Sequence, residues 1–245
     1  MDKKTNKTTG TLYGIGVGPG DPELITLKSV NILKQVDIVF AASSTKNKHS
    51  LAVNIVKPHI PETTQVKLIP FPMTKDTDEA RKAWLENAKI IINDLEQGKD
   101  AAFVTLGDSL TYSTFGYILK NIRLLAPEIH IESIPGITSY QAAASRMNLP
   151  LVEGEESLMI MSGVNGGSRL RNINQQPENI VFLKAYKNVD DIIDALKESD
   201  LIQNSVGITS CGLENEKIVT DINQFINMPP DYWTLIIAKK NKDGS

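Results

Sequence analysis

The chain has 245 residues, of which 41% are hydrophobic and 22% charged, and its formal net charge is −3. This length can bury one large core or two medium-sized cores, and the composition is ordinary for a globular protein. The small negative charge argues against a general nucleic-acid-binding surface, which needs an excess of basic residues. One Cys excludes an internal disulfide, and one Cys with three scattered His offers no cluster for a metal ion.

The apolar segments are short, and both ends of the chain are polar. No apolar run approaches the roughly 20 residues that a membrane-spanning helix needs. Residues 1–10 lack the apolar core of a signal peptide, so we expect a cytoplasmic protein without membrane contact. We also expect residues 1–10 to be disordered and residues 241–245 to form a polar tail.

Apolar and amphipathic segments alternate through the first 150 residues. Residues 101–106 are apolar almost throughout, which is typical of a central strand in a parallel sheet. The alternation predicts an open α/β sheet. The expected strands of this sheet cover residues 12–17, 37–41, 66–69 and 101–106, and a further strand is expected at 129–133. The expected helices cover residues 23–35, 50–57, 76–97, 113–125 and 140–147.

The rest of the chain fits a smaller domain with a mixed sheet. A Gly- and Asn-rich loop is expected at residues 163–174, and a helix at 189–197. The expected strands cover residues 157–161, 180–184, 206–210, 216–219 and 233–238.

A glycine-rich bend, Gly14 to Pro22, joins the first expected strand to the first expected helix. Asp21 suits the N-cap, and Pro22 suits the first helical position. Glycines permit positive φ and a close approach of backbone to a ligand. The bend does not fit the Gly-x-Gly-x-x-Gly dinucleotide motif, because Pro19 and Asp21 occupy the positions of the last glycine. A plain strand-to-helix turn is the alternative.

Two more bends follow expected strands, at residues 107–115 and 134–139. Ligands in open α/β sheets bind outside the carboxyl ends of the strands, so we expect the three bends to meet over one crevice. Gly107 permits a sharp exit from its strand, and Asp108 offers a carboxylate. The alternatives are a turn in which Asp108 bonds its own backbone and a helix start capped by Thr138 or Ser139.

These three bends, in this order and spacing, resemble those of the tetrapyrrole methylases, the class III S-adenosylmethionine-dependent methyltransferases. The residues that carry the resemblance are Gly16-Val-Gly-Pro-Gly-Asp-Pro22, Gly107-Asp108 with Tyr112-Ser-Thr114, and Pro135-Gly-Ile-Thr-Ser139. The resemblance covers residues 11–240. Within the family, the amino-acid sequence is most similar to that of the enzymes that methylate carbon 20 of precorrin-2 or cobalt-factor II in cobalamin synthesis. This finer match lies in residues 10–24, 103–108 and 112–115. Ser109 stands where the family usually has proline, which predicts a looser loop.

The resemblance implies two α/β domains with the cofactor in the cleft between them, and a homodimer. The first domain, residues 11–127, would hold the parallel sheet, and the second, residues 128–240, the mixed sheet. The boundary is expected where Pro127 interrupts a helix.

The resemblance also implies the cofactor, S-adenosyl-L-methionine, with S-adenosyl-L-homocysteine as its product. The matching positions lie in the three bends and at three places in the second domain, the latter aligned by strand pattern alone. They are Pro19, Leu106, Gly107, Asp108, Thr111, Thr138, Ser139, Lys184, Ala185, Gly212, Leu213, Thr234 and Leu235.

Methyl transfer from a sulfonium needs alignment and exclusion of water more than a strong acid or base, and the sequence shows no nucleophile–base set. Asp108 or Tyr112 could assist removal of the proton from the acceptor carbon, and so could water. Lys46, Lys48, Tyr112 and Arg146 are candidates for binding the tetrapyrrole carboxylates or macrocycle, with solvated surface charges as the alternative. Phe115 and Tyr117 could also contact the ring, or belong to the core, where we expect Cys211.

Other members of the family share the three bends. A uroporphyrinogen III methylase, another cobalamin-ring methylase, a diphthine synthase and a ribosomal-RNA 2′-O-methyltransferase therefore remain open. A non-catalytic S-adenosylmethionine-binding module is the alternative of a different class. The sequence does not decide whether the acceptor carries cobalt.

Overall fold

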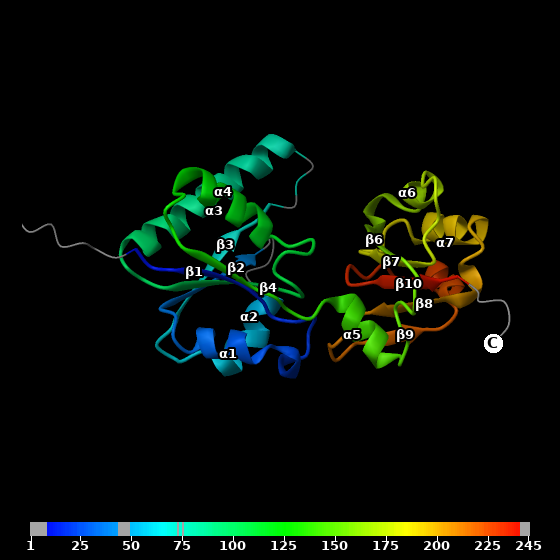
Figure 1. The fold of residues 1–245 in the computed structure, drawn as a ribbon, viewed down its shortest axis with the longest axis horizontal. Coiled ribbons are helices and arrows are strands. Elements are labelled where there is room, and N and C mark those ends of the chain that lie inside the picture. The colour runs from blue at the N-terminus through cyan, green and yellow to red at the C-terminus, as the bar shows by residue number, and fades with distance from the viewer. Residues whose placement is uncertain (1–8, 44–49, 73, 75, 241–245) are drawn as a thin grey trace, which may run out of the picture. The chain divides into compact units, whose positions relative to one another are not determined.

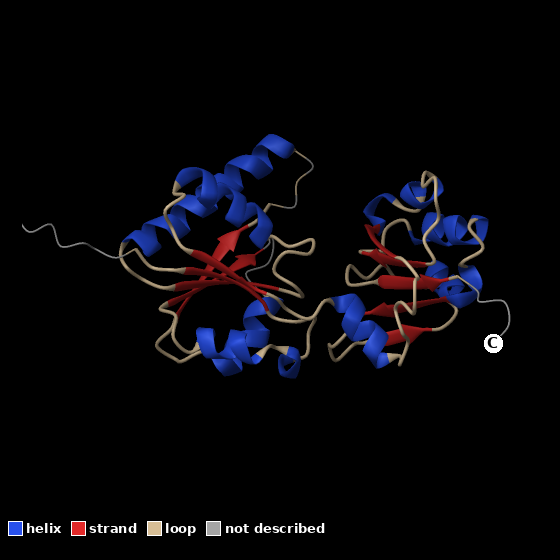
Figure 2. Cartoon of the chain, viewed as in Figure 1, coloured by secondary structure: helices blue, strands red, loops and turns tan. Residues whose placement is uncertain are grey.

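The computed structural model describes residues 9–43, 50–72, 74 and 76–240. The chain divides into two compact units between Thr138 and Ser139 (Figure 1). Each unit is built on its own five-stranded sheet (Figure 2). The expectations for residues 1–8 and 241–245 lie outside the described residues.

The first unit contains a wholly parallel sheet in the order β3-β2-β4-β1-β5. Its strands are β1 (Leu12–Gly16), β2 (Ile38–Ser43), β3 (Gln65–Pro70), β4 (Ala101–Thr105) and β5 (Ile131–Ile134). Its helices are α1 (Leu27–Leu33), α2 (Leu51–Val56), α3 (Thr77–Glu96) and α4 (Phe115–Leu125), with short 3-10 segments at Pro22–Leu24 and Lys57–His59. The predicted open parallel sheet with β4 at its centre is confirmed.

Helices cover both faces of this sheet, with α1 and α2 on one face and α3 and α4 on the other (Figure 1). Successive residues of a strand point to opposite faces, so β4 contributes to two separate apolar clusters. Phe103 packs in a cluster that includes residues of α3 and α4, and Val104 in a cluster that includes residues of α1 and α2. This double burial explains why β4 is apolar almost throughout.

The expected helix at residues 23–35 is wrong in one respect. The backbone is extended at Ile25 and Thr26, so a 3-10 turn is followed by a separate helix. The Asp21 side chain accepts a hydrogen bond from Glu23 N, and the Thr26 side chain accepts one from Ser29 N. Ile25 packs against the core, so the break places an apolar side chain on the sheet.

The boundary between the units differs from the expected one after Pro127. Strand β5 pairs in parallel with β1, so the segment up to Thr138 belongs to the first unit. At the other end, the Gly10 amide donates to the Leu95 carbonyl at 2.8 Å, so Gly10 belongs to the folded unit rather than to a disordered end.

The second unit contains a mixed sheet in the order β6-β7-β10-β8-β9. Strands β6 and β7 are parallel, and the other pairs are antiparallel. The strands are β6 (Leu158–Ser162), β7 (Asn179–Leu183), β8 (Ser205–Thr209), β9 (Lys217–Val219) and β10 (Leu235–Lys239). The helices are α5 (Ser139–Arg146), α6 (Ser168–Arg171) and α7 (Val189–Glu198), with 3-10 segments at Gly163–Asn165, Ile202–Asn204 and Ile222–Asn227. The predicted mixed sheet is confirmed.

Within the described ranges, no helix combines the length and apolar character needed to cross a membrane.

Candidate functional site

The three glycine-bearing bends lie side by side at one edge of the first sheet. Strand β1 runs between β4 and β5, so the bends that follow these strands are neighbours. Gly18 and Gly107 exchange a pair of backbone hydrogen bonds of 3.2 and 2.7 Å. The amide of Val17 also donates to the carbonyl of Thr105 at 3.0 Å.

Glycines form the contact between the bends. A Cβ on Gly16 would lie 2.6 Å from the carbonyl oxygen of Gly107 and 2.7 Å from the amide nitrogen of Gly136. A Cβ on Gly136 would lie 2.3 Å from the same Gly107 oxygen. Any side chain at Gly16 or Gly136 would therefore push the bends apart. The expectation that the three bends meet is confirmed.

The Asp108 carboxylate bridges two of the bends. Its Oδ1 accepts hydrogen bonds from Leu110 N, Thr111 N and Thr111 Oγ1 at 2.9–3.0 Å. Its Oδ2 accepts from Gly136 N at 3.2 Å. Burial raises the pKa of the Asp108 carboxyl, but the bonds from Leu110, Gly136 and Thr111 outweigh burial and hold the pKa below its ordinary value.

Ser109 fastens the same bend to β5. Its side chain is buried, and its hydroxyl donates to the Ile134 carbonyl at 3.0 Å. The expectation of a looser loop at this position is therefore wrong, because a hydrogen bond holds the loop where the family usually has proline.

The remaining site residues of the first unit fall into two groups. Pro19 and Thr138 are buried, and the half-buried Leu106 packs its side chain on the core. Tyr112 is half-exposed and has a φ of 50°, a strained conformation for a side-chain-bearing residue. The Ser113 hydroxyl then accepts from Phe115 N at 3.0 Å, one residue before Thr114, the N-cap of α4.

The predicted cofactor positions of the second unit cluster around the start of β10. Leu235 pairs with Leu183 of β7 and with Ile208 of β8, so the carboxyl ends of β7 and β8 lie beside it. Lys184 and Ala185 follow β7, and the Ala185 amide donates to the carbonyl of Thr234 at 2.9 Å.

The bends that leave β7 and β8 have strained backbone. The φ angles of Lys184 and Ser210 are 58° and 50°, and Gly212 has a φ of 79°, which glycine adopts without strain. Left-handed conformations at residues other than glycine cluster at functional sites. This observation supports the region as a binding site without depending on the sequence resemblance.

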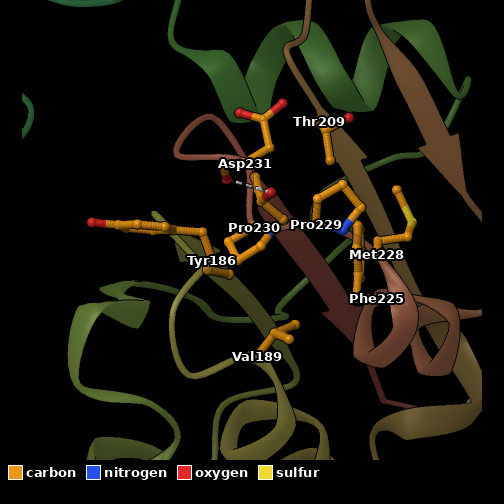
Figure 3. Close-up of a pocket in the computed structure, with 10 residues that line it drawn as sticks. Tyr186, Val189, Thr209, Phe225, Met228, Pro229, Pro230 and Asp231 are labelled. Carbon is orange, nitrogen blue, oxygen red and sulfur yellow. Dashed lines mark hydrogen bonds between the residues drawn. The ribbon is translucent and has the colours of Figure 1, made fainter.

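A small pocket opens beside these bends (Figure 3). It contains two predicted cofactor positions, Ala185 and Thr234, and its other lining residues are mostly apolar. Those residues are Tyr186, Val189, Thr209, Phe225, Met228, Pro229, Pro230 and Asp231.

Asp231 organises one wall of this pocket. Its carboxylate accepts from Ser210 Oγ at 2.8 Å and from Trp233 N at 2.9 Å, and its carbonyl accepts from Thr234 Oγ1 at 2.6 Å. Sequence reasoning missed Asp231. The signal was its position two residues before Trp233, the spacing of an Asx turn.

Arg146, a predicted substrate contact, is joined to the bend after β8. Its Nε donates to Glu216 Oε1 at 3.0 Å, and Glu216 Oε2 accepts from Gly212 N at 2.7 Å. The Arg146 side chain is 64% exposed, whereas that of Glu216 is 16% exposed. Sequence reasoning missed Glu216. Its position four residues after Gly212 is not characteristic of any turn motif, so it did not indicate this hydrogen bond. Gly212 and Leu213 lie within this bend, and Ser139 begins the helix that ends at Arg146.

Two aromatic residues that were candidates for contact with the tetrapyrrole ring pack against other side chains of the protein. Phe115 is fully buried in the core, and Tyr117 stacks on Trp84 with ring centroids 3.8 Å apart. The idea that Phe115 contacts a macrocycle is therefore wrong. Lys46 and Lys48 lie outside the described residues.

Cys211 is buried, as expected. Burial raises the pKa of its thiol to about 11, and the nearby Glu216 carboxylate adds to the shift. The thiol is therefore protonated at neutral pH and is a poor nucleophile. We expect native protein at pH 8 to react with a disulfide reagent at least about tenfold more slowly than protein unfolded in guanidinium. Equal rates, measured by absorbance, would contradict the burial of this thiol.

Comparison with known proteins identifies the family. The model described as Tetrapyrrole (Corrin/Porphyrin) Methylases matches residues 11–225. Cobalt-precorrin-2 C(20)-methyltransferase of Salmonella typhimurium is 32% identical over 94% of this chain and 97% of its own length. Probable cobalt-precorrin-2 C(20)-methyltransferase of Methanocaldococcus jannaschii is 35% identical over 97% of this chain and 99% of its own length.

A solved structure supports the same fold. It is the uroporphyrin-III C-methyl transferase of Thermus thermophilus complexed with S-adenyl homocysteine. It matches with a TM-score of 0.66 at 20% identity, covering 94% of this chain and 97% of that one. From its family match and its two relatives, the chain belongs to the tetrapyrrole (corrin/porphyrin) methylase family.

Proposed function

We propose that this protein is an S-adenosylmethionine-dependent methyltransferase that methylates carbon 20 of precorrin-2 or cobalt-factor II in cobalamin synthesis. One observation carries the proposal: two relatives named for this reaction are 32% and 35% identical over nearly the whole of both chains. The convergence of three bends in the first unit supports the cofactor part of the proposal, because it leaves the main chain of Gly107 facing open space.

The bends offer room for the cofactor. Gly107 has a φ of +73°, and a Cβ built on it would meet nothing within 4 Å. Open space therefore adjoins the main chain of Gly107, while Gly16 and Gly136 close the opposite side. We propose that Pro19, Leu106, Gly107, Thr111 and the segment Thr138–Ser139 hold the cofactor chiefly through backbone groups. In the second unit, the proposed contacts are Lys184, Ala185, Gly212, Leu213, Thr234 and Leu235.

The methyl transfer needs little acid–base catalysis from the protein. When bound, S-adenosylmethionine supplies a methyl group already activated by its sulfonium charge. The main contribution of the bends is to align the donor, worth at most roughly 7–11 kcal/mol. The acceptor carbon of a reduced tetrapyrrole is electron-rich and acts as the nucleophile. Two groups were considered for removing the proton from the acceptor carbon. The Asp108 carboxylate already accepts hydrogen bonds within the protein, and the Tyr112 side chain is half-exposed.

We propose one acceptor contact in each unit, Tyr112 in the first and Arg146 in the second. Arg146 has an exposed side chain and suits a tetrapyrrole carboxylate, and Tyr112 suits the face of the macrocycle. We also propose a cytoplasmic homodimer that does not bind nucleic acid, supported by the family resemblance and by the net charge of −3.

The proposal is tested by single-turnover reactions with S-adenosylmethionine and either metal-free precorrin-2 or the cobalt-bearing ring. Mass spectrometry should show one added methyl, and NMR of the product should place it on carbon 20. Comparison of the two acceptors decides which is the substrate. Uroporphyrinogen III serves as the control and should remain unmethylated. Binding of the cofactor without transfer to any of the three rings would favour a non-catalytic binding module and overturn the proposal.

A further inference from the structure

We infer that Asp108 is a positioning residue, whose carboxylate clamps the bend after β4 to the bend after β5 and so shapes the cofactor site. On this inference, Asp108 does not remove the proton of the acceptor. The inference rests on the proposed function, because it assigns how that site is held together.

The geometry of the four hydrogen bonds separates two tasks. The three donors to Oδ1 come from Leu110 and Thr111, within the same bend. Oδ2 accepts from the amide of Gly136, 28 residues further along the chain. One oxygen therefore folds the bend on itself, and the other joins it to its neighbour.

The two bends that the Asp108 carboxylate joins are also in direct contact at their glycines, Gly107 and Gly136. The Gly107 carbonyl would lie 2.3 Å from a Cβ on Gly136, so the two main chains are in direct contact next to the Asp108 bond. The Ser109 hydroxyl adds a second bond between these bends through the Ile134 carbonyl. A shift of the Gly136 bend would thus move the main chain of Gly107, which faces open space.

The same contacts make Asp108 unsuitable as a base. A general base needs an oxygen free to accept the substrate proton and a pKa near the working pH. Both Asp108 oxygens already accept protein donors, and those donors lower the pKa of the carboxyl. A carboxylate satisfied in this way stabilises loop geometry and has little affinity for another proton.

Asp108→Asn separates the two tasks of the side chain. Its amide oxygen can replace Oδ1 and keep the three bonds within the bend. Its NH₂ group must then face the Gly136 N–H, so two donors meet and the bond between the bends is lost. The flipped amide is worse, because its NH₂ would face three donors. Ser113→Ala is the matched control, since it removes side-chain bonds elsewhere in the same bend, to Thr105 Oγ1 and from Phe115 N, and leaves Asp108 bonded to Gly136.

The experiment measures S-adenosylhomocysteine binding by calorimetry and methyl transfer between pH 6 and 9. We expect D108N to weaken binding by about tenfold and to raise the KM for S-adenosylmethionine, with the pH profile unchanged in shape. S113A should stay within about threefold of wild type. D108E retains a basic carboxylate but displaces its oxygens by one methylene, and it should weaken binding as D108N does; it provides the same test if D108N folds poorly.

Other results would overturn the inference. A kcat reduced by 10²–10⁴, the loss typical of a missing acid–base group, with unchanged binding and a lost limb of the pH profile, would make Asp108 a base. A lower melting temperature with wild-type affinity in the folded protein would make its role merely structural. Failure of wild type itself to bind S-adenosylhomocysteine would overturn the proposed function, and with it this role. Wild-type binding matched by D108N would overturn this inference alone.

Discussion

Gly136→Ala is expected to weaken S-adenosylmethionine binding by at least about 100-fold and to lower the free energy of unfolding by about 1–3 kcal/mol, the usual cost of overpacking. The added Cβ would lie 2.3 Å from the Gly107 oxygen and 2.6 Å from the Gly16 carbonyl carbon. Both neighbours are main chain, so no side chain can rotate away. The bends must separate, and the Asp108–Gly136 bond of 3.2 Å must lengthen. Calorimetry and urea denaturation measure the two effects.

Gly116→Ala is the matched control for this substitution. Gly116 lies in the first turn of α4, and a Cβ built there meets nothing within 4 Å. Alanine in a helix is favoured over glycine by roughly 0.5–1 kcal/mol, so this variant should be slightly more stable and bind normally. Wild-type cofactor affinity in G136A would show that contact between the bends is irrelevant to binding.

Phe115→Ala is expected to lower the free energy of unfolding by about 3–5 kcal/mol, the range for deleting a buried aromatic side chain. Phe115 is fully buried, and its ring centroid lies 5.9 Å from that of Phe103. A Cβ on Gly14 would lie 2.0 Å from the ring, so the ring occupies the space that a side chain on β1 would fill. Removing it leaves a cavity between α4, β1 and β4.

The measurement for Phe115→Ala is chemical denaturation followed by fluorescence and circular dichroism. Each unit has its own apolar core, so if two transitions are resolved, the substitution should shift that of the first unit. Leu124→Ala is the control, because Leu124 lies on the same helix with 76% of its surface exposed. It should change stability by less than about 0.5 kcal/mol. Similar losses in the two variants would contradict the assigned burial.

Periodic and turn signals in the sequence predicted the sheets and the meeting of the bends. Strand β4 was recognisable because burial on both faces leaves an unbroken apolar run. The bends were recognisable because glycine, proline and capping residues act on their immediate neighbours. Local signals of this kind do not depend on the rest of the fold.

Features that depend on distant contacts were missed. The helix break at Ile25 arises because that side chain packs on the sheet, and the membership of β5 in the first sheet depends on pairing with β1. The roles of Ser109, Glu216 and Asp231 are bonds from a side chain to segments whose proximity exists only in the folded chain. Hydrophobic periodicity in the sequence does not indicate which distant segments these side chains bond.

The contact of Gly16, Gly107 and Gly136 is made of peptide groups. On the proposed function, side chains at flanking positions, such as Leu110, can therefore change without altering the main-chain contacts to the donor. On the same proposal, exchanging an exposed side chain there would change which acceptor is bound and leave binding of the methyl donor unchanged. The contact of the three glycines thus separates the residues that determine the acceptor from the main chain that binds the donor.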